Sequence, residues 1–96
     1  MAKPRLTQDQ HTELGRALAG IHDELVRRKV QIENAYPRTR REAFPASRLD
    51  AALHALSEAR AELENAVFRE HPESAATTDY YPHPEDRAVV KAPKKA

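Results

Sequence analysis

The sequence predicts an all-α protein: an antiparallel two-helix hairpin of the coiled-coil type, followed by an irregular C-terminal tail. Apolar residues recur at alternating steps of four and three along two stretches, as they do on the packed face of a helix. A proline follows each stretch, and helical periodicity is absent after Pro72. We therefore divide the chain into an N-terminal arm (1–6), a helical hairpin (7–71) and a tail (72–96).

The first helix is predicted to cover residues 7–35. The order Thr7-Gln8-Asp9-Gln10 has the form of a capping box, in which the threonine hydroxyl and the glutamine amide each satisfy a backbone N–H. Pro37 disfavours helical geometry at Tyr36, so we expect the helix to end just before it. Opposite charges four residues apart support the helix at Asp23/Arg27, Glu24/Arg28 and Lys29/Glu33. Its packing seam consists of Leu14, Leu18, Ile21, Leu25 and Ile32.

Residues 36–46 are predicted to form a basic loop, because they contain two prolines and an arginine cluster and show no helical period. The second helix is expected over 47–71, with Ser47 as its cap and Pro72 as its stop. Small residues beside its seam allow two helix axes to approach closely; they are Ala52, Ala55, Ala59 and Ala66. The seam itself consists of Leu49, Leu53, Leu56, Leu63 and Val67.

One hairpin cannot hide all of this apolar surface. Val26 and Val30 lie roughly 100° or more around the first helix from its seam. We therefore expect the hairpin to pair with a second copy, forming a four-helix bundle, or with a helical surface of another protein. The alternative is that both valines are single exposed apolar residues, which are common on protein surfaces.

The tail contains the run Tyr80-Tyr81-Pro82-His83-Pro84 and ends in a lysine-rich segment. Its prolines and charges are typical of a disordered, solvated tail. Alternatively, Tyr80 and Tyr81, two of only five aromatic residues, anchor an extended strap against the hairpin or a partner, with Pro82 beside them. Both interpretations are open from the sequence.

The composition excludes several kinds of chemistry. The chain has no cysteine, which excludes disulfides, thiolate catalysis and sulfur-ligated zinc. Its two glycines and three serines supply neither a phosphate-binding loop nor the turn that presents a serine nucleophile. None of the ten glutamates has a histidine three positions later, as carboxylate-bridged dimetal bundles require. We therefore expect no enzymatic activity, no cofactor and no metal.

The bulk properties describe a small protein with a thin core. The 96 residues include 17 alanines but only 17 leucine, isoleucine, valine and phenylalanine residues together, and the net charge is +1. No apolar run approaches the roughly 20 residues that a membrane span needs. We therefore expect a cytoplasmic protein that does not interact with membranes.

Four polar residues on the helices need a separate interpretation. Arg28 and Arg60 each occupy a position where the apolar seam is interrupted. We expect them to extend to solvent or to pair with a facing glutamate; the alternative is that they hold an anion between the helices. His54 and Glu58 share a helix face opposite the leucines, where a solvated pair is expected rather than a metal site.

The function predicted from these features is that of a non-catalytic interaction or adaptor module, which binds a protein partner or itself. The partner-binding residues would be Val26, Val30, Tyr80, Tyr81 and Pro82. The alternative is a small nucleic-acid-associated regulator, in which a dimer presents two copies of the basic loop. The residues that would contact phosphate, or an acidic protein surface, are Arg38, Arg40, Arg41 and Arg48.

Overall fold

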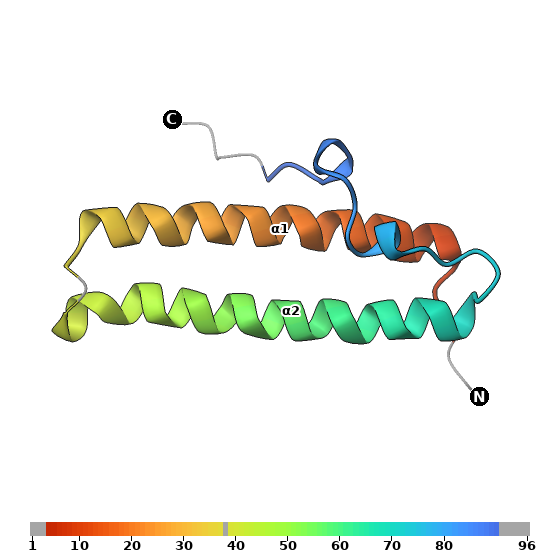
Figure 1. Cartoon of the computed structure of the whole chain (residues 1–96), viewed down its shortest axis with the longest axis horizontal. Helices are drawn as coiled ribbons and strands as arrows, with labels where there is room; N and C mark the ends of the chain where they lie inside the picture. The colour runs from red at the N-terminus through yellow and green to blue at the C-terminus, as the bar shows by residue number, and fades with distance from the viewer. Residues whose placement is uncertain (1–3, 38, 91–96) are drawn as a thin grey trace.

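The computed structural model describes residues 4–37 and 39–90 and has the predicted all-α hairpin. Two long helices, α1 (Gln8–Ala35) and α2 (Phe44–Glu70), lie antiparallel and side by side (Figure 1). The described chain also contains three short 3₁₀ helices: η1 (Arg40–Ala43) lies between α1 and α2, and η2 (Thr77–Asp79) and η3 (Pro84–Asp86) follow α2. The described residues contain no strand, and none of their helices is both long enough and apolar enough to cross a membrane.

Helix α1 begins and ends where local sequence predicts. The capping box is present: the Thr7 hydroxyl accepts a hydrogen bond from the Gln10 amide at 3.1 Å, and the Gln10 side-chain oxygen accepts one from the Thr7 amide at 2.9 Å. Tyr36 is extended, with φ −130° and ψ 149°, as expected for a residue before proline.

Helix α2 begins earlier than predicted, at Phe44 rather than at Ser47. Ala43 precedes it without a side-chain cap, and Pro45 lies in its first turn, where its fixed φ and missing N–H are compatible with a helix. The prediction treated this proline as part of a loop. The connection is therefore shorter than expected, and part of it is the 3₁₀ helix η1.

The interior of the hairpin is small. Among the apolar residues of the described chain, Ala19, Val67 and Tyr80 are fully buried. Of the ten predicted seam residues, Val67 is buried, Ile21 is 42% exposed, and the remaining eight are half-buried. The two helices alone thus leave much of their seam in partial contact with solvent.

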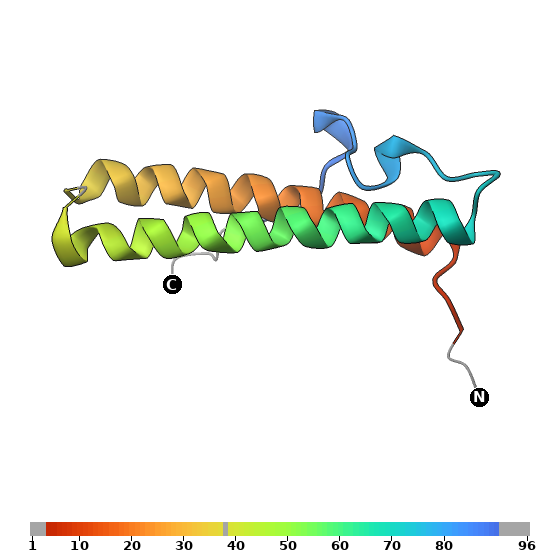
Figure 2. The same ribbon diagram turned by 60° about the horizontal axis from the view of Figure 1, so that its bottom comes forward.

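The described tail, residues 72–90, folds back over the helices, with η2 packed on α1 (Figure 2). Its backbone comes so close to α1 that a Cβ atom at Gly15 would lie 1.7 Å from the carbonyl oxygen of Asp79. A Cβ at Gly20 would lie 2.0 Å from the carbonyl oxygen of Ala88. The Ala88 amide also donates a hydrogen bond to the Arg16 carbonyl at 3.1 Å. Both glycines of the chain are therefore required by the docked tail.

Gly15→Ala should have opposite effects on the helix and on the tail. Alanine in a helix interior is favoured over glycine by about 0.5–1 kcal/mol, so helicity measured by circular dichroism should be kept or increase. The added methyl group overlaps the Asp79 carbonyl, so the tail should detach, and chymotryptic cleavage after Tyr80 should accelerate by roughly ten-fold or more. Asn34→Ala, at an exposed position of α1, is the matched control and should leave cleavage unchanged. Unchanged protection in Gly15→Ala would contradict the docking.

Candidate functional site

A chain of polar contacts at one end of the hairpin holds the tail in place. The hydroxyl of Tyr80, which is 0% exposed, lies 2.6 Å from Nδ1 of His11, and Nε2 of His11 lies 3.0 Å from Oε1 of Glu70. An ionised carboxylate only accepts hydrogen bonds, so in a neutral His11 the proton is on Nε2, and Nδ1 accepts from the Tyr80 hydroxyl. The hydrogen bond from His11 lowers the pKa of Glu70, and burial raises the pKa of Tyr80.

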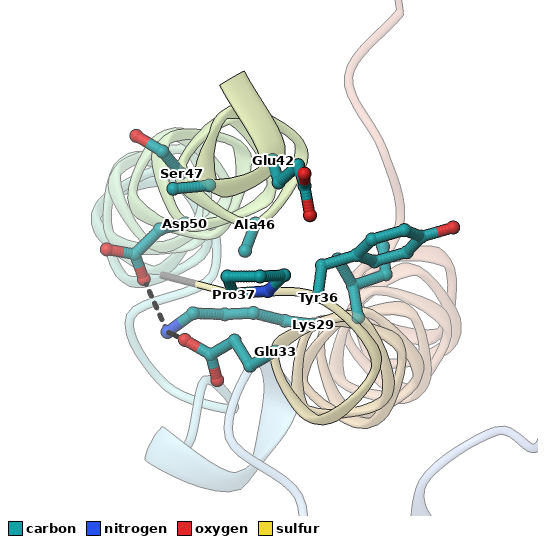
Figure 3. Close-up of a pocket in the computed structure, with 10 residues that line it drawn as sticks. Lys29, Glu33, Tyr36, Pro37, Glu42, Ala46, Ser47 and Asp50 are labelled. Carbon is teal, nitrogen blue, oxygen red and sulfur yellow. Dashed lines mark ion pairs between the residues drawn. The ribbon is translucent and has the colours of Figure 1, made fainter. Parts of the chain in front are cut away.

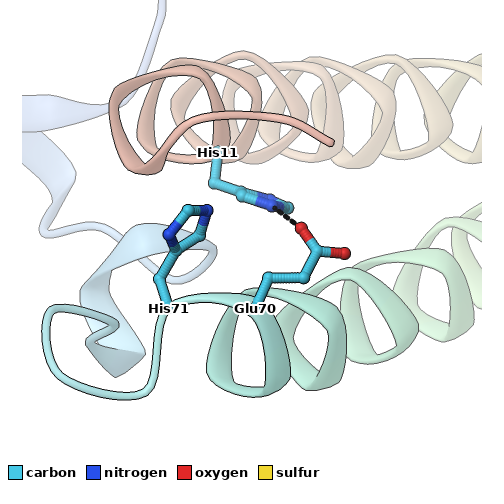
Figure 4. Close-up of side chains that lie close together, drawn as sticks. All are labelled: His11, Glu70 and His71. Atoms are coloured by element: carbon cyan, nitrogen blue, oxygen red, sulfur yellow. Dashed lines mark hydrogen bonds and ion pairs between the residues drawn. The ribbon is translucent and has the colours of Figure 1, made fainter. Parts of the chain in front are cut away.

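The antiparallel arrangement brings this site together, because the first turn of α1 lies beside the last turn of α2. His71, the residue that ends α2, presents its ring edge to His11 at a centroid distance of 5.7 Å (Figure 4). Its Nε2 is 2.9 Å from the carbonyl oxygen of Leu6, to which it donates a hydrogen bond. His11, Glu70 and His71 each place one potential ligand atom within 4.8 Å of the other two. Within the described chain, they are the group of three potential metal-ligating side chains that lie this close together.

Asp79 makes the second anchor of the tail. Its carboxylate accepts hydrogen bonds from the Ala76 amide at 2.9 Å, from the Gln8 side chain at 2.7 Å and from the Thr12 hydroxyl at 2.9 Å. Burial alone would raise the pKa of Asp79, but these hydrogen bonds favour the charged form and lower the pKa below its ordinary value. The ionised carboxylate therefore joins the start of α1 to η2.

Arg60 differs from the expectation that it extends to solvent or pairs with a facing glutamate. It is buried, its Nη2 donates to the carbonyl oxygen of Tyr80 at 2.9 Å, and its guanidinium carbon lies 4.6 Å from the centre of the Tyr81 ring. It thus neither extends to solvent nor pairs with a glutamate, because its guanidinium group contacts the tail backbone and the face of an aromatic ring. Arg28, by contrast, lies 3.4 Å from Glu24 and is an exposed surface residue.

Arg87 fixes the far part of the docked tail. Its Nη1 donates to both carboxylate oxygens of Asp23 at 3.0 Å, and its Nε donates to the Pro82 carbonyl at 3.1 Å. Burial opposes ionisation of Asp23, but the hydrogen bonds and charge interactions with Arg87 and His22 together outweigh burial and lower the pKa of Asp23. The predicted Asp23/Arg27 pair is therefore wrong: Asp23 binds the tail, and Arg27 pairs with Glu24 at 2.6 Å.

The five residues predicted to bind a partner divide into two groups. Val26 and Val30 are exposed on α1, at 39% and 47%. Tyr80 and Pro82 are buried within the chain, and Tyr81 packs one ring face near Arg60. The tail interpretation that fits residues 72–90 is therefore the strap against the hairpin, and only the valines and part of Tyr81 face solvent.

The hairpin turn carries charges of both signs. Arg41 and Arg48 are exposed, whereas Arg38 and the side chain of Arg40 lie outside the described part of the structure. A cavity of about 220 Å³ lies between the helices here, with Glu42 in its lining (Figure 3). Lys29 reaches across it and lies 2.9 Å from Asp50 and 3.9 Å from Glu33. His54 and Glu58 form the expected exposed pair at 3.2 Å.

Comparison with known proteins identifies no relative: no protein-family model, no curated protein and no solved structure matches this chain.

One feature of the sequence, a pair of glycines within the first helix, could have indicated that the tail docks there. Gly15 and Gly20 lie in the middle of a strongly periodic helix, where glycine is unfavourable unless something approaches the backbone closely. The contacts of His11 and the hydrogen bonds from α1 to Asp79 had no comparable signal, because they join residues that are 59–71 positions apart along the chain.

Acidification should release the tail. Asp79 has a lowered pKa in the folded protein, so its contribution to docking is complete above the ordinary aspartate pKa of about 3.9 and is lost as the pH falls through the lower folded value. Near-ultraviolet circular dichroism of the tyrosines, followed from neutral pH to about pH 2, should show this loss. Asp79→Asn should weaken docking already at neutral pH and flatten the acid transition. Asp86→Asn, on the exposed η3, is the control; an acid transition identical in all three proteins would contradict the assignment.

Proposed function

We propose that the protein is a non-catalytic helical interaction module that pairs with a second copy of itself as a four-helix bundle. The observation that supports this most directly is the half-buried seam: one of ten seam residues is fully buried after the hairpin and the tail have packed. A second hairpin would cover this surface at roughly 25 cal/mol per Å² of apolar area removed from water.

The face available for pairing is the one opposite the tail. Ile21 lies about 160–180° around α1 from Ala19 and Thr12, which contact or adjoin the tail, at 100° per residue. Leu14 and Ala17 lie near Ile21 on this side of α1 and line a shallow hollow together with Leu6, Gln10 and Glu13. A stripe of small side chains on α2 lies about 100° around that helix from the tail-binding Arg60; it consists of Ala52, Ala59 and Ala66. Small residues suit the close packing of helix axes.

A second exposed surface supports the adaptor part of the proposal. Gly15, Ala19, Val26 and Val30 are spaced by four, seven and four residues, so they lie on one face of α1. The tail covers the first two, and the two valines continue the same face beyond it as exposed residues. We propose that this surface contacts a different protein, with part of Tyr81 at its edge.

The polar groups of the site support a structural role rather than catalysis. The chain of contacts from Glu70 through His11 ends on the Tyr80 hydroxyl, and Tyr80 has no exposed surface through which a substrate could be reached. A general acid or base must come within hydrogen-bond reach of the reacting group. In this protein the Tyr80 hydroxyl of the tail already occupies the hydrogen-bonding position at Nδ1 of His11.

The alternative, nucleic-acid binding by the basic loop, has weaker support. Glu33, Glu42 and Asp50 line the cavity at the same end of the hairpin as the arginines, which reduces the local positive potential. Phosphate binding would also depend steeply on salt concentration. This alternative would act through the predicted arginines, of which Arg41 and Arg48 are exposed in the described part of the chain.

Self-association should depend on the face opposite the tail. Analytical ultracentrifugation of the full chain over a concentration series should give a dimer, and Ile21→Glu should shift it to monomer, because a charge would be buried in the interface. Val30→Glu and Val89→Glu, at exposed positions outside this face, should stay dimeric. A monomer at all concentrations would refute the bundle, and dissociation by Val30→Glu alone would move the interface to the valine surface. Salt-sensitive binding of DNA or RNA that is lost in Arg41→Ala/Arg48→Ala would favour the alternative function.

A further inference from the structure

We propose that His11, Glu70 and His71 form a binding site for Zn²⁺ at the end of the hairpin where α1 begins and α2 ends. The residues come from the first turn of α1, from the last residue of α2 and from the residue that caps α2, and their side chains converge (Figure 4). The three ligand atoms lie within 4.8 Å of one another. Two imidazole nitrogens and a carboxylate oxygen are a ligand set that Zn²⁺ accepts, with water in the fourth position.

Two of the ligands already have the spacing of atoms bound to one ion. Nε2 of His11 and Oε1 of Glu70 are 3.0 Å apart. Atoms bound at about 2.0–2.1 Å in tetrahedral geometry lie roughly 3.3 Å from each other. His71 has to approach by no more than about 1.5 Å to complete the set. Its position at the helix end and its half-buried side chain allow this movement.

Metal binding requires a change of tautomer but no change of net charge on His11. In the metal-free site, Nε2 of His11 carries the proton that is donated to Glu70. With the ion on Nε2, the proton lies on Nδ1 and is donated to the Tyr80 hydroxyl oxygen, 2.6 Å away. His71 would bind the ion through one of its two ring nitrogens, and binding through Nε2 would first require the loss of its hydrogen bond to the Leu6 carbonyl.

The surroundings of His11 are those of a metal-binding histidine. Such a residue is usually oriented by a hydrogen bond from its second ring nitrogen to a polar group of the protein. Tyr80 provides this group, and it holds the ring of His11, which is 2% exposed. Because Tyr80 belongs to the tail, a bound ion would join α1, α2 and the tail, independently of the proposed self-association.

The test is calorimetric titration of the full chain, freed of metal with a chelator, with zinc sulfate and separately with magnesium chloride. We expect one Zn²⁺ per chain with a dissociation constant in the micromolar range or below, and no binding of Mg²⁺, which prefers oxygen ligands. His71→Ala and Glu70→Gln should each weaken Zn²⁺ binding by at least about ten-fold. Both variants retain the His11 contact with Tyr80, and circular dichroism confirms that they are folded before the titration.

His54→Ala is the matched control. His54 also pairs with a glutamate, Glu58, at 3.2 Å, but on the exposed face of α2 and without a third ligand. Zinc binding should be unchanged in this variant. Absence of Zn²⁺ binding by the unmodified chain would overturn the proposal. The proposal would also be overturned if His71→Ala and Glu70→Gln bound Zn²⁺ as tightly as the unmodified chain, or if only His54→Ala lost affinity.

Discussion

The close approach of the tail backbone to α1 is the constraint on which the rest of the structure depends. It is possible only because Gly15 and Gly20 present no side chain where the carbonyl groups of Asp79 and Ala88 lie. Each glycine weakens the helix by about 0.5–1 kcal/mol relative to alanine. At this separation the Tyr80 hydroxyl reaches His11, the Tyr80 carbonyl reaches Arg60, and the tail becomes part of the folded unit.

Directional polar contacts, rather than a large apolar core, hold the tail in one position on the helices. The apolar core of the described chain consists of Ala19, Val67 and Tyr80, whereas His11, Arg60 and Asp79 are buried polar groups whose partners are in the tail or its anchors. A buried polar group that loses its partner destabilises the fold by about 1–3 kcal/mol, so such contacts favour one arrangement of the tail over many loosely packed ones. The position of the tail is therefore specific although the apolar area that it buries is small.

The tail also determines which apolar surfaces remain open. It covers the face of α1 that begins at Gly15 and Ala19, and it leaves Val26 and Val30 exposed further along the same face. The opposite face contains Ile21, which is 42% exposed. The proposed pairing of two hairpins uses that opposite face, so self-association and tail docking are compatible, and the valine surface stays free for a different protein.

The sequence alone determined the parts of the structure that depend on neighbouring residues. The Thr7 capping box, the stop at Pro37 and the two apolar seams are local patterns, and together they define an antiparallel hairpin. The start of α2 was placed too late because Pro45 is compatible with both a loop and a first helical turn, and nothing local distinguishes the two. The position of the tail and the contacts that join it to the helices depend on the packing, since His11 and Arg60 and the α1 partners of Asp79 meet groups that are 20 to 71 residues away along the chain. Contacts over such separations depend on how the helices and the tail pack, which the periodicity of the sequence does not encode. The two glycines within α1 were the one local feature that indicated the close approach of the tail.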